Sequence, residues 1–269
     1  MQAPETFGII AGNGAYPKEL ALAARRAGVQ KIVAAAFTNE TDSKLSEQVD
    51  VIDWMRVGQL ARLLKFFKEN GVRQAVMAGQ IAPGNLFDLH PDWKALLLLA
   101  KLKKRNAESI FSAIADELDK VGTDLLPATT FMGDSIANSG LIAGPKLGKR
   151  QRDDIQFGLN IAKEIARLDI GQTVIIRNGT VLAVEGFDGT NETIRRGGKL
   201  AGTDAIMIKV SKPNQDMRFD VPVVGVETVQ VAREAHVRAI AVEAGRTLLL
   251  EKTAILEEAN RSQISIFGC

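Results

Sequence analysis

The chain has 269 residues, enough for one large or two ordinary domains, and its 46% of hydrophobic residues is typical of an ordinary globular protein. Its 34 basic and 32 acidic residues nearly cancel, so no global field attracts nucleic acid and we expect no nucleic-acid partner. A single cysteine excludes an intrachain disulfide and a cysteine-rich zinc site, and without a signal-peptide pattern or a long apolar run we expect a cytoplasmic protein.

The first half alternates apolar strands with helices. The predicted strands are residues 7–11, 31–37, 49–54 and 73–78, and the predicted helices are 17–26 and 57–70. Alternation at this spacing is typical of a parallel sheet covered on both faces. We therefore predict an α/β fold that begins with a Rossmann-like nucleotide-binding domain over residues 1–132.

Two glycine-containing turns follow strands of this predicted sheet. The first precedes a helix, so its backbone N–H groups suit a phosphate or sugar oxygen, although Pro17 replaces the third glycine of the dinucleotide fingerprint. The second follows the fourth strand, where its glutamine would reach a base or a ribose. The predicted substrate-binding residues are Gly12, Asn13, Gly14, Gly79 and Gln80. The alternatives are a tight structural turn and a glutamine that faces water.

Further predicted elements are two helices and a strand, at residues 92–105, 107–121 and 124–129. The first helix combines Trp93 and four leucines at 96–99 with a basic end at 101–105. Four leucines on one helix are typical of core packing. The alternative is an apolar surface with a cationic rim, which suits acyl chains or an anionic membrane face. In that case Leu96 is the first candidate for a wall of the substrate site.

Residues 133–152 are predicted to form a linker, because they are rich in Gly, Ser and Asn and contain Pro145. Beyond them, Asn178-Gly179 is a two-residue hairpin signal between apolar strands. The predicted strands here are 173–176, 181–184, 206–210, short ones near residues 239 and 248, and 264–267, and the helices are 153–168, 190–196, 227–235 and 254–261. This mixture predicts a mixed α/β catalytic domain over 153–269 and not a second Rossmann unit.

The segment 204–225 concentrates charge between two apolar runs. Lys209 lies in a strand, and Asp216, Arg218 and Asp220 precede the second run. Carboxylates and cations near one strand end suit a metal ion and a phosphate, since Mg²⁺ takes oxygen ligands and phosphate oxygens accept from Lys and Arg. The alternative is a solvated hairpin with surface ion pairs.

The loop after strand 181–184 carries a second pair of acids. Glycines on both sides of Asp188 let the backbone approach a ligand closely, and Glu185 and Asp188 would join Asp220 around one metal ion. The alternative is a polar turn before a helix, with Thr190 as a candidate N-cap.

Several short motifs occur in order along nearly the whole chain, and together they resemble the LpxI family of UDP-2,3-diacylglucosamine pyrophosphatases. The motifs lie at residues 8–14, 77–81, 89–93, 184–190, 208–210, 216–225 and 241–246. The resemblance implies a Mg²⁺-dependent hydrolase of lipid A biosynthesis that splits UDP-2,3-diacylglucosamine into UMP and 2,3-diacylglucosamine 1-phosphate. It further implies a cleft between the two domains and attack of water on the phosphorus nearer the sugar.

The resemblance also implies roles for single residues. The key acid falls on Asp220 by its Arg-Phe-Asp-x-Pro setting, and Lys209 and Thr190 match polar positions of the family's site. The expected catalytic residues are Asp220, Lys209 and Thr190, and the expected Mg²⁺ ligands are Asp220, Glu185 and Asp188. Two departures from the family pattern, at Val226 and Asn191, concern loop geometry.

The expected partners are the lipid substrate and its lipid product at the cytoplasmic face of the inner membrane. Basic residues of the 101–105 helix end and of the linker would hold the protein there peripherally. A homo-oligomer is left open. The runner-up hypothesis, which uses the first domain alone, is an NAD-dependent oxidoreductase or another nucleotide-sugar-binding enzyme. A third hypothesis, a non-catalytic lipid-binding or regulatory protein, predicts no metal dependence.

Overall fold

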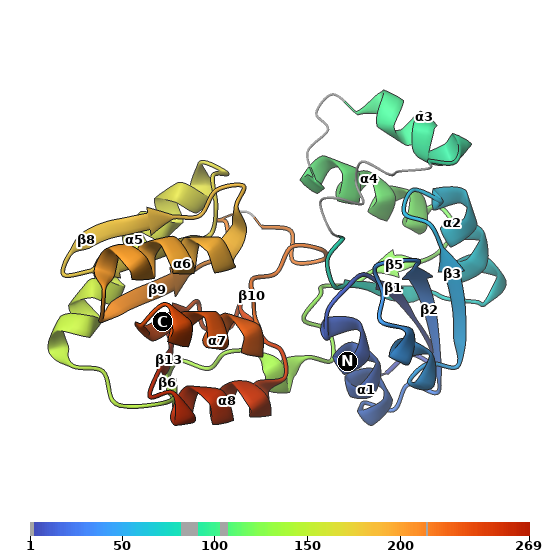
Figure 1. The fold of residues 1–269 in the computed structure, drawn as a ribbon. Coiled ribbons are helices and arrows are strands. Elements are labelled where there is room, and N and C mark those ends of the chain that lie inside the picture. Colours follow the sequence, from blue (N-terminus) through green and yellow to red (C-terminus); the bar gives the residue numbers. More distant parts are fainter. Residues whose placement is uncertain (1–2, 82–90, 103–106, 214) are drawn as a thin grey trace. The chain divides into compact units, whose positions relative to one another are not determined.

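The computed structural model describes residues 3–81, 91–102, 107–213 and 215–269, and it divides into two compact units. The N-terminal unit is Met1–Gly133 together with Asp216–Asp220, and the C-terminal unit is Asp134–Gln215 together with Val221–Cys269. Both units combine a central sheet with helices (Figure 1). The predicted α/β class is confirmed.

The N-terminal unit contains a five-stranded sheet in the order β3-β2-β1-β4-β5, and every neighbouring pair is parallel. Its strands are β1 (Thr6–Ala11), β2 (Lys31–Phe37), β3 (Val51–Met55), β4 (Gln74–Ala78) and β5 (Asp124–Leu125). Its helices are α1 (Tyr16–Arg26), the 3₁₀ helix η1 (Ser43–Glu47), α2 (Leu60–Glu69), α3 (Trp93–Lys101) and α4 (Ala107–Asp119). The parallel Rossmann-like sheet is therefore as predicted. The predicted strand 124–129 is much shorter, because Pro127 has no N–H to continue a ladder.

The C-terminal unit contains a six-stranded sheet in the order β6-β13-β11-β9-β7-β8. Its strands are β6 (Gly140–Ala143), β7 (Thr173–Arg177), β8 (Thr180–Val184), β9 (Ala205–Lys209), β11 (Val237–Val242) and β13 (Ser265–Gly268). The three central strands β13, β11 and β9 are parallel, whereas β6, β7 and β8 each pair antiparallel with a neighbour. The predicted hairpin at Asn178-Gly179 joins β7 and β8, and the mixed sheet confirms that this unit is not a second Rossmann unit.

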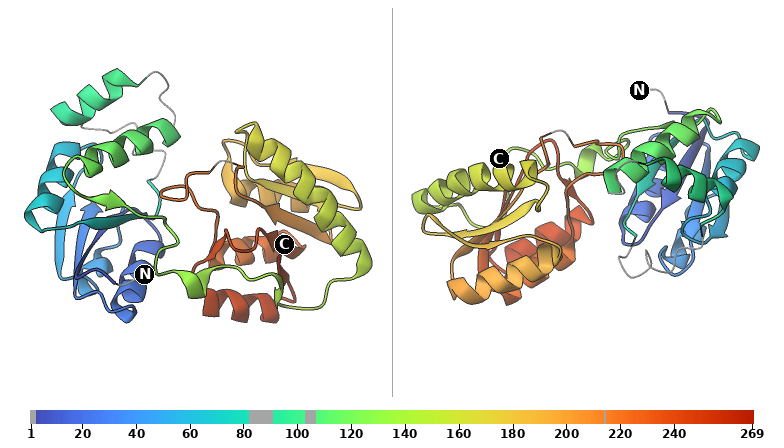
Figure 2. Two further views of the ribbon diagram at one scale, coloured as in Figure 1. Left: turned by 180° about the vertical axis from the view of Figure 1, so that it is seen from behind. Right: turned by 90° about the horizontal axis from the view of Figure 1, so that it is seen from above.

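Helices cover both faces of this second sheet (Figure 2). One face packs on α5 (Lys149–Arg167), and the other packs on α6 (Gly189–Ala201), α7 (Val226–Glu234) and α8 (Lys252–Arg261). Gly158 of α5 and Gly197 of α6 allow the close approach, since an added Cβ at either position would lie within 2.6 Å of an isoleucine side-chain atom of the sheet. Residues 133–152, predicted as a linker, contain β6 and the first residues of α5.

The segment 204–225 is not the hairpin that was considered as an alternative. Strand β9 lies between β11 and β7, and the later apolar run forms β10 (Val223–Val224), which pairs with β12 (Leu248–Leu249) in a small separate sheet. The residues between them, Asp216–Asp220, belong to the N-terminal unit. The Ala128 N–H donates to the Met217 carbonyl at 2.6 Å, and the Phe219 ring packs on Phe111 with ring centroids 5.5 Å apart. Packing of the Phe219 ring stabilises the segment Asp216–Asp220 against the N-terminal unit. A strand pairing is not needed to hold it there.

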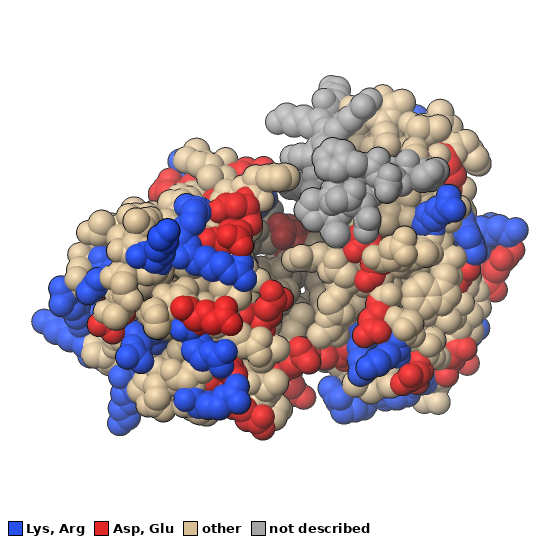
Figure 3. All heavy atoms as spheres, viewed as in Figure 1, with Lys and Arg blue, Asp and Glu red and all other residues tan. Residues whose placement is uncertain are grey.

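Within the described ranges, no helix has both the length and the apolar character needed to cross a bilayer. On the face drawn in Figure 3, acidic and basic side chains are interspersed over the described parts of both units.

Candidate functional site

The predicted nucleotide loops lie at the point of the first sheet where ligands bind in this class of fold. Strand order reverses between β1 and β4, and their carboxyl ends lead into Gly12-Asn13-Gly14 and Gly79-Gln80. The two loops pair directly, because the Gly12 N–H donates to the Ala78 carbonyl and the Asn13 N–H donates to the Gln80 carbonyl, both at 2.7 Å. The structure thus brings together the five predicted substrate-binding residues of these two loops.

This pairing narrows how a ligand could use the loops. The N–H groups of Gly12 and Asn13 already donate to backbone carbonyls, so they are not the phosphate donors that the sequence suggested. What remains for a ligand is Gly14 at φ +84°, the first turn of α1, the Gln80 side chain and the part of the Asn13 amide that does not donate to Glu40. A phosphate at this helix N-terminus would be stabilised by the helix dipole.

Gly12 is required by this contact, and its replacement by alanine tests the geometry. An added Cβ would lie 2.4 Å from the Gln80 carbonyl oxygen and 2.8 Å from the Gln80 nitrogen. We expect Gly12→Ala to lower the free energy of unfolding by about 1–3 kcal/mol. Gly133→Ala, at an open position, is the control and should change it by less than about 0.5 kcal/mol. Equal stabilities in chemical denaturation would show that the loops are not in this contact.

A second group of polar residues lies at one edge of the C-terminal sheet. Because β8 and the central parallel strands run in the same direction, their carboxyl ends meet there. Lys209 Nζ donates to Thr190 Oγ1 at 2.7 Å, and Thr190 Oγ1 donates to Glu185 Oε1 at 2.7 Å. Three of the predicted site residues therefore form one hydrogen-bonded chain beside the N-terminus of α6.

Glu185 is held as a carboxylate in this chain. Burial raises the pKa of Glu185, but the Lys209 charge, the Thr190 hydroxyl and the Gln172 N–H (3.1 Å) together bring it below the usual value of 4.5. The negative charge of Glu185 attracts the Lys209 ammonium, and its carboxylate accepts from the Thr190 hydroxyl and so orients it. The first turn of α6 adds a positive partial charge to the same place. An ammonium and a helix N-terminus together suit a phosphate oxygen.

The lowered pKa of Glu185 predicts a specific dependence of stability on pH. A depressed folded-state pKa gives stability that is present above pH 4.5 and is lost as the pH falls through the folded value. We expect Glu185→Gln to make the fall in the free energy of unfolding below pH 4.5 less steep, as measured by urea unfolding at several pH values. Glu192→Gln, on the exposed side of α6, is the control. An unchanged slope in Glu185→Gln would contradict the assignment.

The other predicted metal ligands are placed differently. Asp188 accepts from the Arg196 guanidinium at 2.7 Å, and this charge and the Gly186 N–H lower its pKa. Asp220 belongs to the N-terminal unit. Across the described part of the chain, no three His, Cys, Asp or Glu side chains converge as in a preformed metal site. A common metal site of Glu185, Asp188 and Asp220 stays a prediction.

Asp220 is half-buried at the end of a short turn that positions its backbone. Its N–H donates to the Asp216 carbonyl at 3.0 Å, and the Arg218 guanidinium binds the Asp216 carboxylate at 2.7 Å. The Arg218 hydrogen bonds lower the pKa of Asp216. Asp216 and Arg218 are thus partners that shape the turn, and the carboxylate of Asp220 lies at the end of it.

One polar cluster at the same sheet edge was not assigned from the sequence. Glu243 follows β11, and its carboxylate accepts from Lys163 Nζ at 2.6 Å and from the backbone and hydroxyl of buried Ser211 at 2.9 and 2.6 Å. Arg246 also donates to the Ser211 hydroxyl at 3.1 Å. The cluster fixes the chain where it leaves β9. The sequence feature that could have indicated this cluster is Glu243 itself, an acid directly after an apolar strand in the 241–246 motif.

Leu96 lies on α3, whose four leucines divide between core and surface: Leu98 packs against the apolar core of the unit, whereas Leu96 and Leu97 are exposed. Leu96 is 54% exposed, and Leu97 and Trp93 on the same helix are 52% and 66% exposed. The basic end at 103–105, like the motif residues up to His90, lies outside the described residues. The described part of α3 presents an apolar surface.

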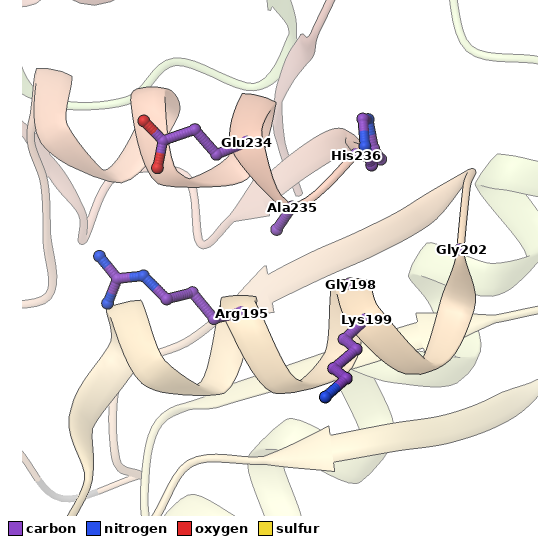
Figure 4. Close-up of a pocket in the computed structure, with 7 residues that line it drawn as sticks. All are labelled: Arg195, Gly198, Lys199, Gly202, Glu234, Ala235 and His236. Carbon is purple, nitrogen blue, oxygen red and sulfur yellow. The ribbon is translucent and has the colours of Figure 1, made fainter.

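The C-terminal unit also has an open groove of about 440 Å³ between α6 and the end of α7 (Figure 4). Arg195 and Lys199 line it from α6, and Glu234 and His236 line it from the opposite side. It follows the C-terminal half of α6, whereas Thr190 is in the first turn. No predicted site residue lines it.

The fold and these edges define an α/β protein of two units, with polar groups at the carboxyl ends of parallel strands. The chain belongs to the LpxI family. The LpxI N-terminal domain model matches residues 6–135, and the LpxI C-terminal domain model matches residues 138–267. The resemblance found from the short motifs is thereby confirmed.

The proteins and structures that match this chain differ greatly in their similarity to it. A protein of Caulobacter vibrioides named UDP-2,3-diacylglucosamine pyrophosphatase LpxI is 29% identical over 275 residues, which cover 97% of this chain and 96% of that protein. The biotin carboxylase domain of 2-oxoglutarate carboxylase from Hydrogenobacter thermophilus is 14% identical with a TM-score of 0.30. The biotin carboxylase subunit of a pyruvate carboxylase is 16% identical with a TM-score of 0.27. These two matches cover 67% and 68% of this chain but only 36% of each solved chain, and their TM-scores are too low for an argument.

Proposed function

We propose that this chain hydrolyses the pyrophosphate bond of UDP-2,3-diacylglucosamine to UMP and 2,3-diacylglucosamine 1-phosphate, as a step of lipid A biosynthesis. The observation that carries the proposal is the agreement between LpxI family membership over both units and the Lys209–Thr190–Glu185 chain at a helix N-terminus. Cleavage of a phosphoanhydride requires neutralisation of charge on the phosphoryl oxygens, which these groups suit.

The residues divide into two roles. The paired loops of the N-terminal sheet, with Asn13 and Gln80, would bind the nucleotide. Lys209 and the first turn of α6 would bind phosphate oxygens, while Glu185 attracts the Lys209 ammonium and fixes the Thr190 hydroxyl.

Mg²⁺ is proposed as the cofactor, with Asp220 as its protein ligand. Mg²⁺ sites in phosphoryl-transfer enzymes commonly use one or two carboxylates and complete the coordination with substrate phosphates and water. The exposed part of Asp220 at the end of its turn fits this donor set. When bound, the ion would supply charge neutralisation and activation of water. We further propose Glu185 and Asp188 as supporting ligands.

The apolar surface of α3 is proposed to meet acyl chains of the substrate and to hold the protein peripherally at the cytoplasmic face of the inner membrane. Trp93, Leu96 and Leu97 are all more than half exposed on it. Flotation with anionic liposomes at low salt tests the membrane part. We expect Leu96→Ser/Leu97→Ser to float less than the wild type, and no flotation of the wild type would contradict the proposal.

The function itself is tested by incubating the protein with UDP-2,3-diacylglucosamine, with Mg²⁺ or with EDTA, and measuring UMP. We expect UMP release with Mg²⁺ and its loss with EDTA. Binding of UDP and NAD in parallel separates the proposal from an NAD-dependent oxidoreductase. Binding of NAD without binding of UDP would contradict the proposal.

A further inference from the structure

Among the described residues, Phe187 is the most exposed large hydrophobic side chain. It is 98% exposed, and the next value is 67%, for Leu200. Phe187 lies between Glu185 and Thr190, in the loop that joins β8 to α6 and carries part of the proposed phosphate site. A ring this exposed packs against almost nothing in the protein, and leaving so large an apolar surface in water is unfavourable.

The loop that carries Phe187 is held on both sides of the ring. Asp188 accepts from the Gly186 N–H at 3.0 Å and from the Arg196 guanidinium at 2.7 Å. The same guanidinium donates to the Val184 carbonyl at 2.9 Å and so ties the loop to the end of β8. These contacts fix the backbone before and after Phe187, and the loop therefore holds the ring out in solvent.

The neighbours of Phe187 limit what could meet its ring. Glu185 and Thr190 belong to the hydrogen-bonded chain that reaches Lys209. Because three residues separate Phe187 from Thr190 along the chain, their Cα atoms lie within about 11 Å of each other. A ligand group that meets the ring is therefore joined by a few bonds to the phosphate that these residues would bind.

We propose that Phe187 contacts the acyl chains of the substrate where they leave the glucosamine ring. The inference rests on the proposed function, in which the N-terminal loops bind the nucleotide and Lys209 binds phosphate oxygens. The acylated sugar is then the part of the substrate beyond that phosphate, and its first methylenes are the nearest apolar surface. An aromatic ring offers a large apolar face, which suits methylenes better than it suits charged oxygens.

The experiment measures binding of two ligands by calorimetry, with no vesicle or detergent present. The ligands are 2,3-dihexanoylglucosamine 1-phosphate and its 2,3-diacetyl counterpart, which differ only in acyl-chain length. The proteins are the full-length wild type, Phe187→Ser, Phe187→Leu and Leu200→Ser. Leu200 lies at the other end of α6, so its variant is the control for loss of an exposed apolar side chain. Thermal unfolding of the four proteins checks the fold.

We expect the wild type and Leu200→Ser to prefer the hexanoyl ligand by about tenfold or more, and Phe187→Ser to reduce this preference to about threefold or less. Phe187→Leu should retain most of the preference, because leucine is also apolar. A residue that only shapes the loop would weaken both ligands equally, so an unchanged ratio in Phe187→Ser overturns the inference. Equal binding of the two ligands by the wild type, or binding of neither, also overturns it.

Two further measurements separate the inference from its alternatives. Phe187→Ser should bind UMP as the wild type does, and weaker binding of UMP would indicate that the ring stacks on the base, which overturns the inference. UMP release from UDP-2,3-diacylglucosamine tests the proposed function by itself. A chain-length preference that depends on Phe187 in a protein that releases no UMP would support Phe187 and contradict the proposed function. UMP release with an unchanged ratio would do the reverse.

Discussion

Asp220→Asn is expected to lower kcat by about 10³-fold while the fold and the binding of UMP are retained. Asparagine keeps the size of the side chain, and the residue keeps its backbone hydrogen bond to Asp216. The substitution removes the charge that is proposed to bind Mg²⁺ and to act on the attacking water. The measurement is UMP release under saturating UDP-2,3-diacylglucosamine, with thermal unfolding and UMP binding of the same preparations.

Asp216→Asn is the matched control, since it makes the same change four residues earlier. It loses the ion pair with Arg218, which is partly exposed, and we expect a stability change of less than about 1 kcal/mol. Its kcat should stay within about tenfold of the wild type, because the Asp220 carboxylate remains. Near-normal turnover in Asp220→Asn, or an equal loss of kcat in both variants, would contradict the catalytic role assigned to Asp220.

Lys209→Met is expected to lower kcat/KM by about 10²-fold to 10³-fold, because it removes the ammonium that would face the phosphoryl oxygens. It also leaves the Glu185 carboxylate without the Lys209 charge, so we expect a loss of about 1–3 kcal/mol in the free energy of unfolding. Denaturation and steady-state kinetics on the same variant measure the two effects.

A double variant separates these effects. Adding Glu185→Gln to Lys209→Met removes the uncompensated carboxylate, so we expect stability to recover while activity does not. Lys212→Met, at a nearby position whose ammonium pairs with Asp169, is the control for loss of a positive charge. Recovery of activity in the double variant would show that Lys209 acts through stability and not on the substrate.

Much of the fold follows from local pattern. Alternating apolar runs and helices predicted the parallel sheet of the N-terminal unit, and the Asn178-Gly179 turn predicted the β7–β8 hairpin. These signals are short-range, since each depends on a few consecutive residues. The sequence grouped Glu185 and Asp188 with Asp220, whereas the hydrogen-bonded chain of the structure joins Glu185 to Thr190 and Lys209, since the ends of strands that run in one direction converge at one edge.

What the sequence did not predict depends on long-range contacts. The segment with Asp220 was considered as a hairpin within its own domain, but Phe219 is held by the apolar cluster of the N-terminal unit. The leucines of α3 form a helical apolar run. The local sequence pattern does not determine whether another element covers Leu96 and Leu97, which are exposed in the structure.

The most direct test of the account is the identity of the products formed from UDP-2,3-diacylglucosamine. Mass spectrometry of a reaction with Mg²⁺ should find UMP and 2,3-diacylglucosamine 1-phosphate in equal amounts from the wild type, and intact substrate from Asp220→Asn. UDP together with a sugar that carries no phosphate, or intact substrate from a folded wild type, would contradict hydrolysis of the pyrophosphate bond.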